Sequence, residues 1–178
     1  MRGYFGIGVE RISKAMNVGT LFRSAHAFDA SFVFTIDACY DPEHTSSDTA
    51  KTPGQLPFYR FASAVELRLP DGCKLVGIEM MDDADELPSF RHPARAAYVL
   101  GPERGRLSDG LLARCDKLVK IPTKFSINLG VCGAIVMYDR ILTLGRHAVR
   151  PVSELALPEP GADHVYGEPR ARSRKATS

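Results

Sequence analysis

The stretch from residue 99 to residue 141 is the feature that most constrains the fold of this chain. It holds an apolar run that ends in Gly-Pro-Glu-Arg-Gly, a short amphipathic segment, and a second apolar run that ends in Ile121-Pro122. A polar turn with Ser126 and Asn128 follows, and then a long apolar helix. Two strand ends beside such a turn bring main-chain groups to one place, where an α/β protein usually holds a ligand.

Short apolar runs continue this pattern along the chain. They predict strands at residues 4–10, 32–36, 59–61, 74–79, 96–100 and 117–121. Helical segments alternate with these strands, while the acidic segment over 80–93 is rich in turn residues. The alternation predicts a single α/β domain with a mostly parallel sheet flanked by helices.

Helices are expected between these strands. Apolar residues at helical spacing predict a helix over 17–28, with Asn17 as its N-cap, and Ser108 is placed to cap a helix over 109–114. A short helix is also expected near 63–67. The longest helix covers 128–146 and is apolar on most sides, so it must be buried against the sheet or a partner subunit.

Length and hydropathy exclude some classes of protein. A chain of 178 residues is long enough for one domain with a core and short for two. No apolar run approaches the roughly 20 residues that a membrane-spanning helix needs. The first residues lack the apolar core of a secretory signal. We therefore expect a cytoplasmic protein without a membrane partner.

The four cysteines, Cys39, Cys73, Cys115 and Cys132, lie far apart and form no C-x-x-C pair. In a cytosolic protein this spacing favours buried, inert thiols over a zinc site or disulfides.

Two segments differ from the rest in composition. Residues 41–57 are polar and rich in Ser, Thr and Pro, and a loop of this length is either functional or mobile. Basic residues gather in the last 33 residues, which include Arg146, His147, Arg150, Arg170, Arg172, Arg174 and Lys175. A basic end of this kind either contacts phosphates or is simply solvated, and the sequence leaves both open. We predict a domain over 1–147 and a flexible basic tail over 148–178.

Common ligand signatures are absent, including those for nucleoside triphosphates, dinucleotides, serine hydrolases and zinc proteases. Three other blocks do occur in order: N-x-G-x-x-x-R-x-A from Asn17, L-G-P-E-R-G-x-L-S from Leu100, and I-P-x-x-x-S-I-N-L from Ile121. Together they resemble the three signature motifs of the SpoU class (TrmH-like) of SPOUT RNA methyltransferases. The resemblance covers residues 4 to about 146.

This resemblance implies methyl transfer from S-adenosylmethionine to a ribose 2′-hydroxyl of tRNA or rRNA. It implies a homodimer in which each RNA site draws residues from both subunits. It also implies a deep trefoil knot in the C-terminal part of the domain, which is a rare exception to unknotted topology. The sulfonium cofactor is already activated, so no metal is required, and the protein must supply alignment of the methyl carbon with the attacking oxygen.

Five residues match the catalytic positions of the motifs. Asn17 and Arg23 match the first motif, Glu103 matches the second, and Ser126 and Asn128 match the third. For Glu103 and Asn128 a purely structural role, as a salt-bridge partner and as an N-cap, also stays open.

The family arginine is thought to help activate the ribose hydroxyl. Arg23 is normally charged and a poor base, so it acts as a base only if it is unusually deprotonated. Alternatively it stabilises the developing alkoxide and holds a phosphate, which we favour.

The resemblance also implies which residues contact the cofactor. It should lie against Glu79, Met80, Leu100, Gly101, Glu103, Ile121, Ser126, Ile127 and Leu129.

The chain departs from the motifs at two places. Gly130 stands where many relatives have Ser, and the turn over 123–125 is shorter than is common. No separate RNA-binding domain is recognisable. The candidates for RNA contacts are therefore the 41–57 loop, the dimer groove and the basic tail. This minimal organisation favours tRNA over rRNA as the substrate. The main alternative is a catalytically silent RNA-binding relative. A third hypothesis is a small-molecule enzyme of the doubly wound class, but the sequence contains no nucleotide-binding motif that would support it.

Overall fold

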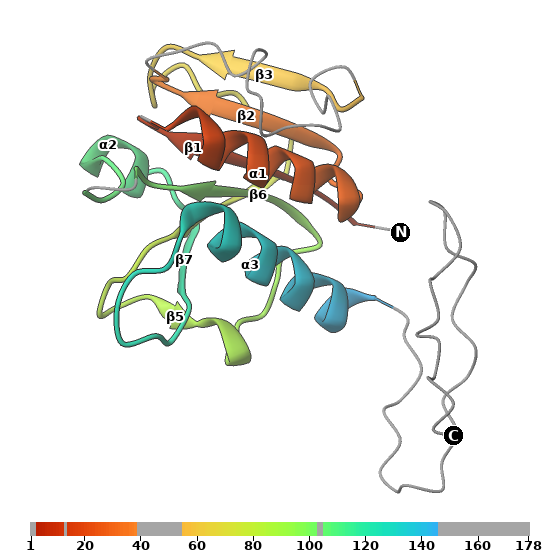
Figure 1. Cartoon of the computed structure of the whole chain (residues 1–178), viewed down its shortest axis with the longest axis vertical. Helices are drawn as coiled ribbons and strands as arrows, with labels where there is room; N and C mark the ends of the chain where they lie inside the picture. Colours follow the sequence, from red (N-terminus) through yellow and green to blue (C-terminus); the bar gives the residue numbers. More distant parts are fainter. Residues whose placement is uncertain (1–2, 13, 39–54, 103–104, 146–178) are drawn as a thin grey trace, which may run out of the picture. The chain divides into compact units, whose positions relative to one another are not determined.

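The computed structural model describes residues 3–12, 14–38, 55–102 and 105–145 (Figure 1). These residues belong to one compact unit, Met1–Gly145. The predicted tail, most of the 41–57 loop, Cys39 and Glu103 lie outside the described residues. No described helix has the length and hydropathy that crossing a bilayer requires.

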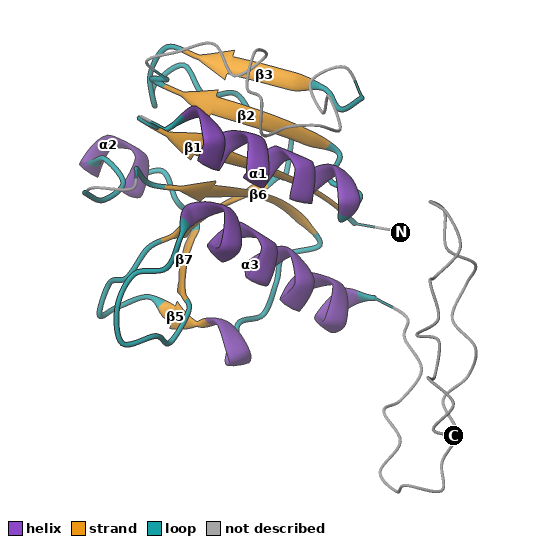
Figure 2. Cartoon of the chain, in the orientation of Figure 1, coloured by secondary structure: helices purple, strands orange, loops and turns teal. Residues whose placement is uncertain are grey.

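A seven-stranded sheet forms the centre of this unit. Its strand order is β3-β2-β1-β6-β4-β7-β5, and every pairing is parallel (Figures 1 and 2). The strands are β1 Tyr4–Glu10, β2 Phe32–Ile36, β3 Phe58–Phe61, β4 Lys74–Ile78, β5 Asp85–Glu86, β6 Arg95–Leu100 and β7 Lys117–Lys120. The parallel α/β sheet predicted from the sequence is thus confirmed. The near-continuous apolar runs of β1, β2 and β6 are buried because parallel strands are covered on both faces.

The helices are α1 Ala15–Ala27, α2 Asp109–Leu112 and α3 Leu129–Leu144, with a 3₁₀ turn at Leu87–Ser89. Helices α1 and α3 lie side by side on one face of the sheet, where Leu21, Val136 and Met137 join the larger apolar cluster (Figure 2). On the other face, Leu67 and Leu111 pack in a second cluster. The sheet is therefore buried on both sides.

Two glycines allow the close approach of α1 and α3. A Cβ atom at Gly133 would lie 2.1 Å from the Leu21 Cδ1 atom, and one at Gly130 would lie 2.8 Å from the Thr20 Cγ2 atom. Side chains at these positions would require Leu21 and Thr20, or the helices themselves, to move. The departure from the family Ser at Gly130 therefore accompanies a tight helix contact.

Arg140 anchors the C-terminal half of α3 to the amino ends of β1 and β6. Its side chain is only 5% exposed and donates hydrogen bonds to the carbonyls of Pro93 at 2.6 Å and Ala94 at 2.8 Å, and to the Tyr98 hydroxyl at 3.1 Å. Its guanidinium also lies over the Phe5 ring. Carbonyl and hydroxyl dipoles thus solvate this buried charge in place of water.

His92 extends the same network. Its Nδ1 atom lies 2.6 Å from the Tyr98 hydroxyl, and its Nε2 atom lies 2.9 Å from the Asp139 carboxylate. Burial lowers the pKa of His92, although its hydrogen bond to Asp139 partly offsets this. A neutral ring with its proton on Nε2 fits all partners: Arg140 donates to Tyr98, Tyr98 to His92, and His92 to Asp139.

Three details differ from the sequence prediction. Helix α1 begins at Ala15 with Lys14 at its N-cap, so Asn17 lies inside the first turn, because Ala15 and Met16 already favour the helix. Residues 63–67 form no helix, and 63–66 are a bend followed by a turn. The acidic segment contains β5, whose two polar residues give no strand pattern.

Candidate active site

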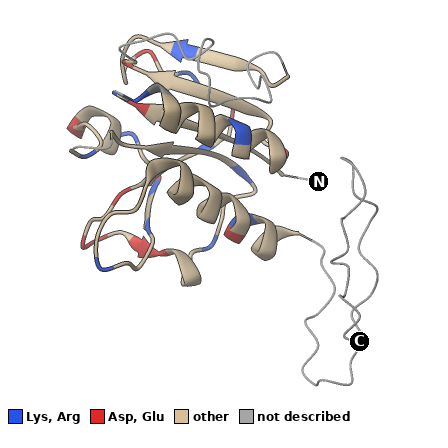
Figure 3. Ribbon diagram, in the orientation of Figure 1, with Lys and Arg blue, Asp and Glu red and all other residues tan. Residues whose placement is uncertain are grey.

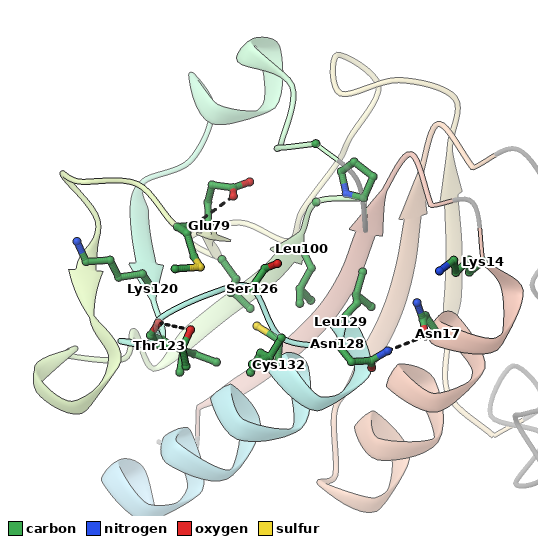
Figure 4. A pocket seen from close by; sticks show the side chains of 17 residues that line it. Lys14, Asn17, Glu79, Leu100, Lys120, Thr123, Ser126, Asn128, Leu129 and Cys132 are labelled. Carbon is green, nitrogen blue, oxygen red and sulfur yellow. Dashed lines mark hydrogen bonds between the residues drawn. The ribbon is translucent and has the colours of Figure 1, made fainter.

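A cavity of about 460 Å³ lies at the carboxyl ends of β4, β6 and β7 (Figure 4). Its lining comprises residues 78–80, 100–102, 105, 120, 121, 123 and 126–129, together with Lys14, Asn17 and Cys132. The carboxyl ends of neighbouring parallel strands meet at one edge of a sheet, so segments distant in sequence converge there. This is a usual position for a small-molecule site in an open α/β sheet.

The structure brings most of the sequence-predicted site residues together. Eight of the nine residues expected to contact the cofactor line this cavity, as do Asn17 and Asn128. The ninth, Glu103, lies outside the described residues. Arg23 is exposed on α1 and is not part of the lining. Six residues along a helix correspond to a rotation of about 240° after one full turn, so Arg23 faces a different direction from Asn17.

Asn128 joins the starts of α1 and α3. Its Oδ1 atom accepts hydrogen bonds from the main-chain N–H groups of Gly130 at 2.9 Å and Val131 at 3.4 Å, which caps α3. Its Nδ2 atom donates to Asn17 Oδ1 at 3.0 Å (Figure 4). The structural reading of Asn128 as an N-cap is correct, and the same side chain also lies at the cavity.

Two carboxylates hold the segment that follows β6. Glu79 accepts hydrogen bonds from the main-chain N–H groups of Met80 at 3.1 Å and Leu107 at 2.9 Å. Glu10, only 2% exposed, accepts from the main-chain N–H of Ser108 at 2.7 Å and from the Ser108 hydroxyl. Sequence reasoning missed Glu10, and a glutamate at the end of an otherwise apolar strand is the signal that could have found it.

The short turn between Ile121 and Ser126 is internally bonded. The Thr123 hydroxyl donates to the Phe125 carbonyl at 2.9 Å and lies 3.4 Å from that of Ile121. The Thr123 N–H also donates to the Ile121 carbonyl. Within the part of the chain that the structure describes, the Ser126 side chain makes no hydrogen bond, so its hydroxyl is available to a ligand.

Cys132 and two lysines complete the lining. Burial raises the pKa of the Cys132 thiol to about 11, and the nearby Glu79 charge adds to this, so the thiol is neutral at pH 7 and forms an inert wall. Lys120 donates to the carbonyls of Met81 at 3.0 Å and Asp82 at 3.2 Å, which fixes the segment after β4. Lys14 is exposed at the cavity. The described residues contain no group of three His, Cys, Asp or Glu side chains that could hold a metal.

A parallel sheet with a cavity at its strand ends is an architecture in which α/β proteins usually hold small molecules. The chain belongs to the SpoU rRNA methylase family, whose sequence model matches residues 5–138. This confirms the resemblance read from the three motifs.

Individual relatives each match more than two thirds of this chain. It is 25% identical over 142 residues to the mouse (Mus musculus) tRNA (guanosine(18)-2′-O)-methyltransferase TARBP1, which corresponds to 72% of this chain and 9% of that protein. It superimposes with a TM-score of 0.71 and 24% identity on the SpoU methyltransferase AviRb from Streptomyces viridochromogenes in complex with AdoMet, covering 82% of this chain and 60% of AviRb.

A third similar structure was described under the heading of 2-OH methylation of C/U34 on tRNA. Its TM-score is 0.67 at 20% identity, and the match covers 82% of this chain and all of that chain. The present chain thus spans a small fraction of the mouse protein, about 60% of AviRb and the full length of this third structure.

Proposed function

We propose that this protein binds S-adenosylmethionine in the cavity at the ends of β4, β6 and β7 and transfers its methyl group to a ribose 2′-hydroxyl of RNA. The convergence of eight predicted cofactor residues on one cavity supports this most directly. Family membership and the AdoMet complex of AviRb support it independently.

The chemistry of the lining suits this cofactor. Ile78, Leu100 and Leu129 provide apolar surface for an adenine ring, and the carboxylate of Glu79 lies in the same cavity for polar groups or the cationic sulfonium. Bound S-adenosylmethionine supplies an activated methyl group. The task of the chain is then to exclude water and to align the acceptor oxygen. The hydroxyl of Ser126 and the Asn17–Asn128 pair lie where they can orient groups at the cavity.

The active form in this proposal is a homodimer. Helix α3 exposes apolar side chains on its outer face, namely those of Val131, Ile135, Tyr138, Leu142 and Leu144. A helix of this kind is expected to be covered. Because Arg23 does not line the cavity of its own subunit, it acts at the cavity of the partner. There the guanidinium stabilises the developing alkoxide and holds a phosphate of the substrate.

The proposed substrate is tRNA in preference to rRNA. The names of the mouse relative and of the C/U34 structure refer to tRNA, whereas the family description refers to rRNA. Among the described residues, Lys and Arg positions are spread over β3, α1 and the segments beside β7 and do not gather on one element (Figure 3). In this proposal the RNA is bound by scattered basic residues that contact phosphates, by the groove of the dimer, and by residues outside the part of the chain that the structure describes.

The proposal also includes the trefoil knot of the family, formed by the chain after β6. The placement of β4 between β6 and β7 supports the knot. Because of this strand order, the segment from β7 to α3 must pass the ends of β4 and β6.

Binding and transfer are tested separately with the purified protein. Calorimetric titration with S-adenosylmethionine should give one site per chain. Incubation with total tRNA, and separately with total rRNA, should create a 2′-O-methyl nucleoside in the tRNA that mass spectrometry detects. Binding without transfer to tRNA or rRNA would exclude the activity, and the absence of both would favour the catalytically silent relative.

A further inference from the structure

Phe125 is the most exposed aromatic residue beside the cavity. Its side chain is 75% exposed, and the cavity is lined by Thr123, two residues before it, and by Ser126, directly after it. Phe125 makes no ring contact within the described part of the chain. Single exposed apolar side chains are common, so exposure alone carries no conclusion. The position and the rigidity of this one are what distinguish it.

A proline and two hydrogen bonds restrain the turn that carries Phe125. Pro122 restricts the backbone at its start. The hydrogen bond from the Thr123 hydroxyl reaches the carbonyl of Phe125 itself at 2.9 Å, and the Thr123 N–H bonds to the Ile121 carbonyl at 2.8 Å. The ring is therefore presented by a preorganised loop, which lowers the entropic cost of using it for binding.

Cationic groups flank the same opening. Lys124, next to Phe125 in the turn, is exposed, and Lys14 is exposed at the start of α1. Figure 4 shows Lys14 and Thr123 on opposite sides of the cavity. An aromatic face with cations beside it is the combination that proteins use for single-stranded nucleic acid, because bases stack on the ring while the cations meet phosphates.

We propose that the Phe125 ring is a stacking surface for an unpaired nucleobase of the RNA substrate, either the target base or its neighbour. This subsite rests on the proposed function. A ribose hydroxyl can enter the cavity only if its nucleotide leaves the regular helix stack, and the freed base then needs a new face to cover it. Phe125 supplies that face beside Ser126.

Kinetics provide the first test. Phe125→Ala should raise KM for RNA roughly 5- to 100-fold, the range expected for loss of one stacked base, while the affinity for S-adenosylmethionine and kcat at saturating RNA stay unchanged. Phe125→Tyr should retain KM, and Phe125→Leu, which is apolar but has no π-face, should not. Tyr59→Ala is the matched control, because Tyr59 is a half-exposed aromatic residue on the edge strand β3.

Fluorescence provides a second test that does not depend on catalysis. The chain contains no tryptophan, so Phe125→Trp introduces a single tryptophan at the subsite, whose emission is distinct from that of the tyrosines. Titration with total tRNA, and separately with total rRNA, should quench this fluorescence when a base stacks on the ring. The emission of Tyr59→Trp should change little under the same conditions.

Several outcomes would overturn the subsite. They are an unchanged KM in Phe125→Ala, full activity in Phe125→Leu, a changed affinity for S-adenosylmethionine, or dissociation of the Phe125→Ala dimer in sedimentation, which would show that the ring packs between copies. If Phe125→Trp is quenched but no RNA is methylated, the subsite stands and the proposed activity fails. If RNA is methylated but Phe125→Trp is not quenched and Phe125→Ala leaves KM unchanged, the proposed activity stands and the subsite fails.

Discussion

A single side chain, that of Asn128, fixes the relation between two elements that line the cavity. Replacing Asn128 with Ala removes both the cap of α3 and the bond to Asn17, and should lower the free energy of unfolding by about 1 kcal/mol. Asn128→Asp cannot donate a hydrogen bond to Asn17, but it keeps an acceptor at the cap of α3 and places a negative charge at the helix N-terminus. The stability of this variant should therefore stay near that of the wild type. Urea denaturation compares the two. Equal losses in both variants would place the stability in the Asn17 bond instead of the cap.

His92 should make stability depend on pH. Its pKa in the folded protein lies below the ordinary value of 6.5, so the unfolded chain takes up the proton first as the pH falls. Stability is therefore complete above about pH 6.5 and is lost progressively on acidification below it. The groups that face His92, namely Tyr98, Asp139 and Arg140, include a carboxylate that only partly offsets burial.

Thermal unfolding between pH 7.5 and 5.5 measures this dependence. The wild type should lose more stability over this range than His92→Gln, because Gln has no proton to gain. A steeper loss in His92→Gln would contradict the account of the network.

At the scale of elements, apolar runs located the strands well because each buried parallel strand must be apolar over most of its length. The same logic could not find β5, since Asp85 and Glu86 are polar and pair with the chain only at the sheet edge. It also misplaced the start of α1, because a helix can begin before a good capping residue when the preceding residues favour it. The two errors differ in cause: one element lacks a pattern, and the other has two permissible starts.

The α1–α3 contact should be intolerant of added volume. Gly133→Ala would place a Cβ atom 2.1 Å from Leu21 Cδ1, and the cost of overpacking should exceed the roughly 1 kcal/mol that alanine gains in a helix. We expect a net loss of about 1 kcal/mol in urea denaturation. Gly110→Ala in α2 is the matched control, because no atom lies within 4 Å of its Cβ position. A Gly133→Ala protein as stable as the control would show that the helices can move apart at little cost.

For the molecule as a whole, the three motifs predicted the cavity because the carboxyl ends of parallel strands meet, whatever their separation in sequence. Contacts that depend on a particular partner could not be predicted. Glu10 is bonded to Ser108, 98 residues away, and His92 to Asp139, 47 residues away, and neither pair has a local pattern. The position of Arg23 outside the cavity is likewise a property of the folded chain, and it leads to the dimer in the proposed function.

Mixing two inactive variants tests whether Arg23 acts across the dimer. Arg23→Ala removes the guanidinium, and Cys132→Phe fills the cavity of the other chain. If Arg23 serves the partner, a mixed dimer has one intact site, and random exchange of subunits should restore about one quarter of wild-type methyl transfer, since about half of the dimers are mixed and each has one of two sites. Exchange with no recovery would place Arg23 in its own subunit or outside the reaction.

The proposed activity is methylation of a ribose 2′-hydroxyl of RNA. The decisive measurement is nucleoside mass spectrometry of tRNA and rRNA from cells with the gene, from cells without it, and from cells without it that carry either a wild-type or an Arg23→Ala copy. We predict that one 2′-O-methyl nucleotide disappears with the gene, returns with the wild-type copy and does not return with Arg23→Ala. An identical set of 2′-O-methyl nucleotides in all of these cells would contradict the proposed activity.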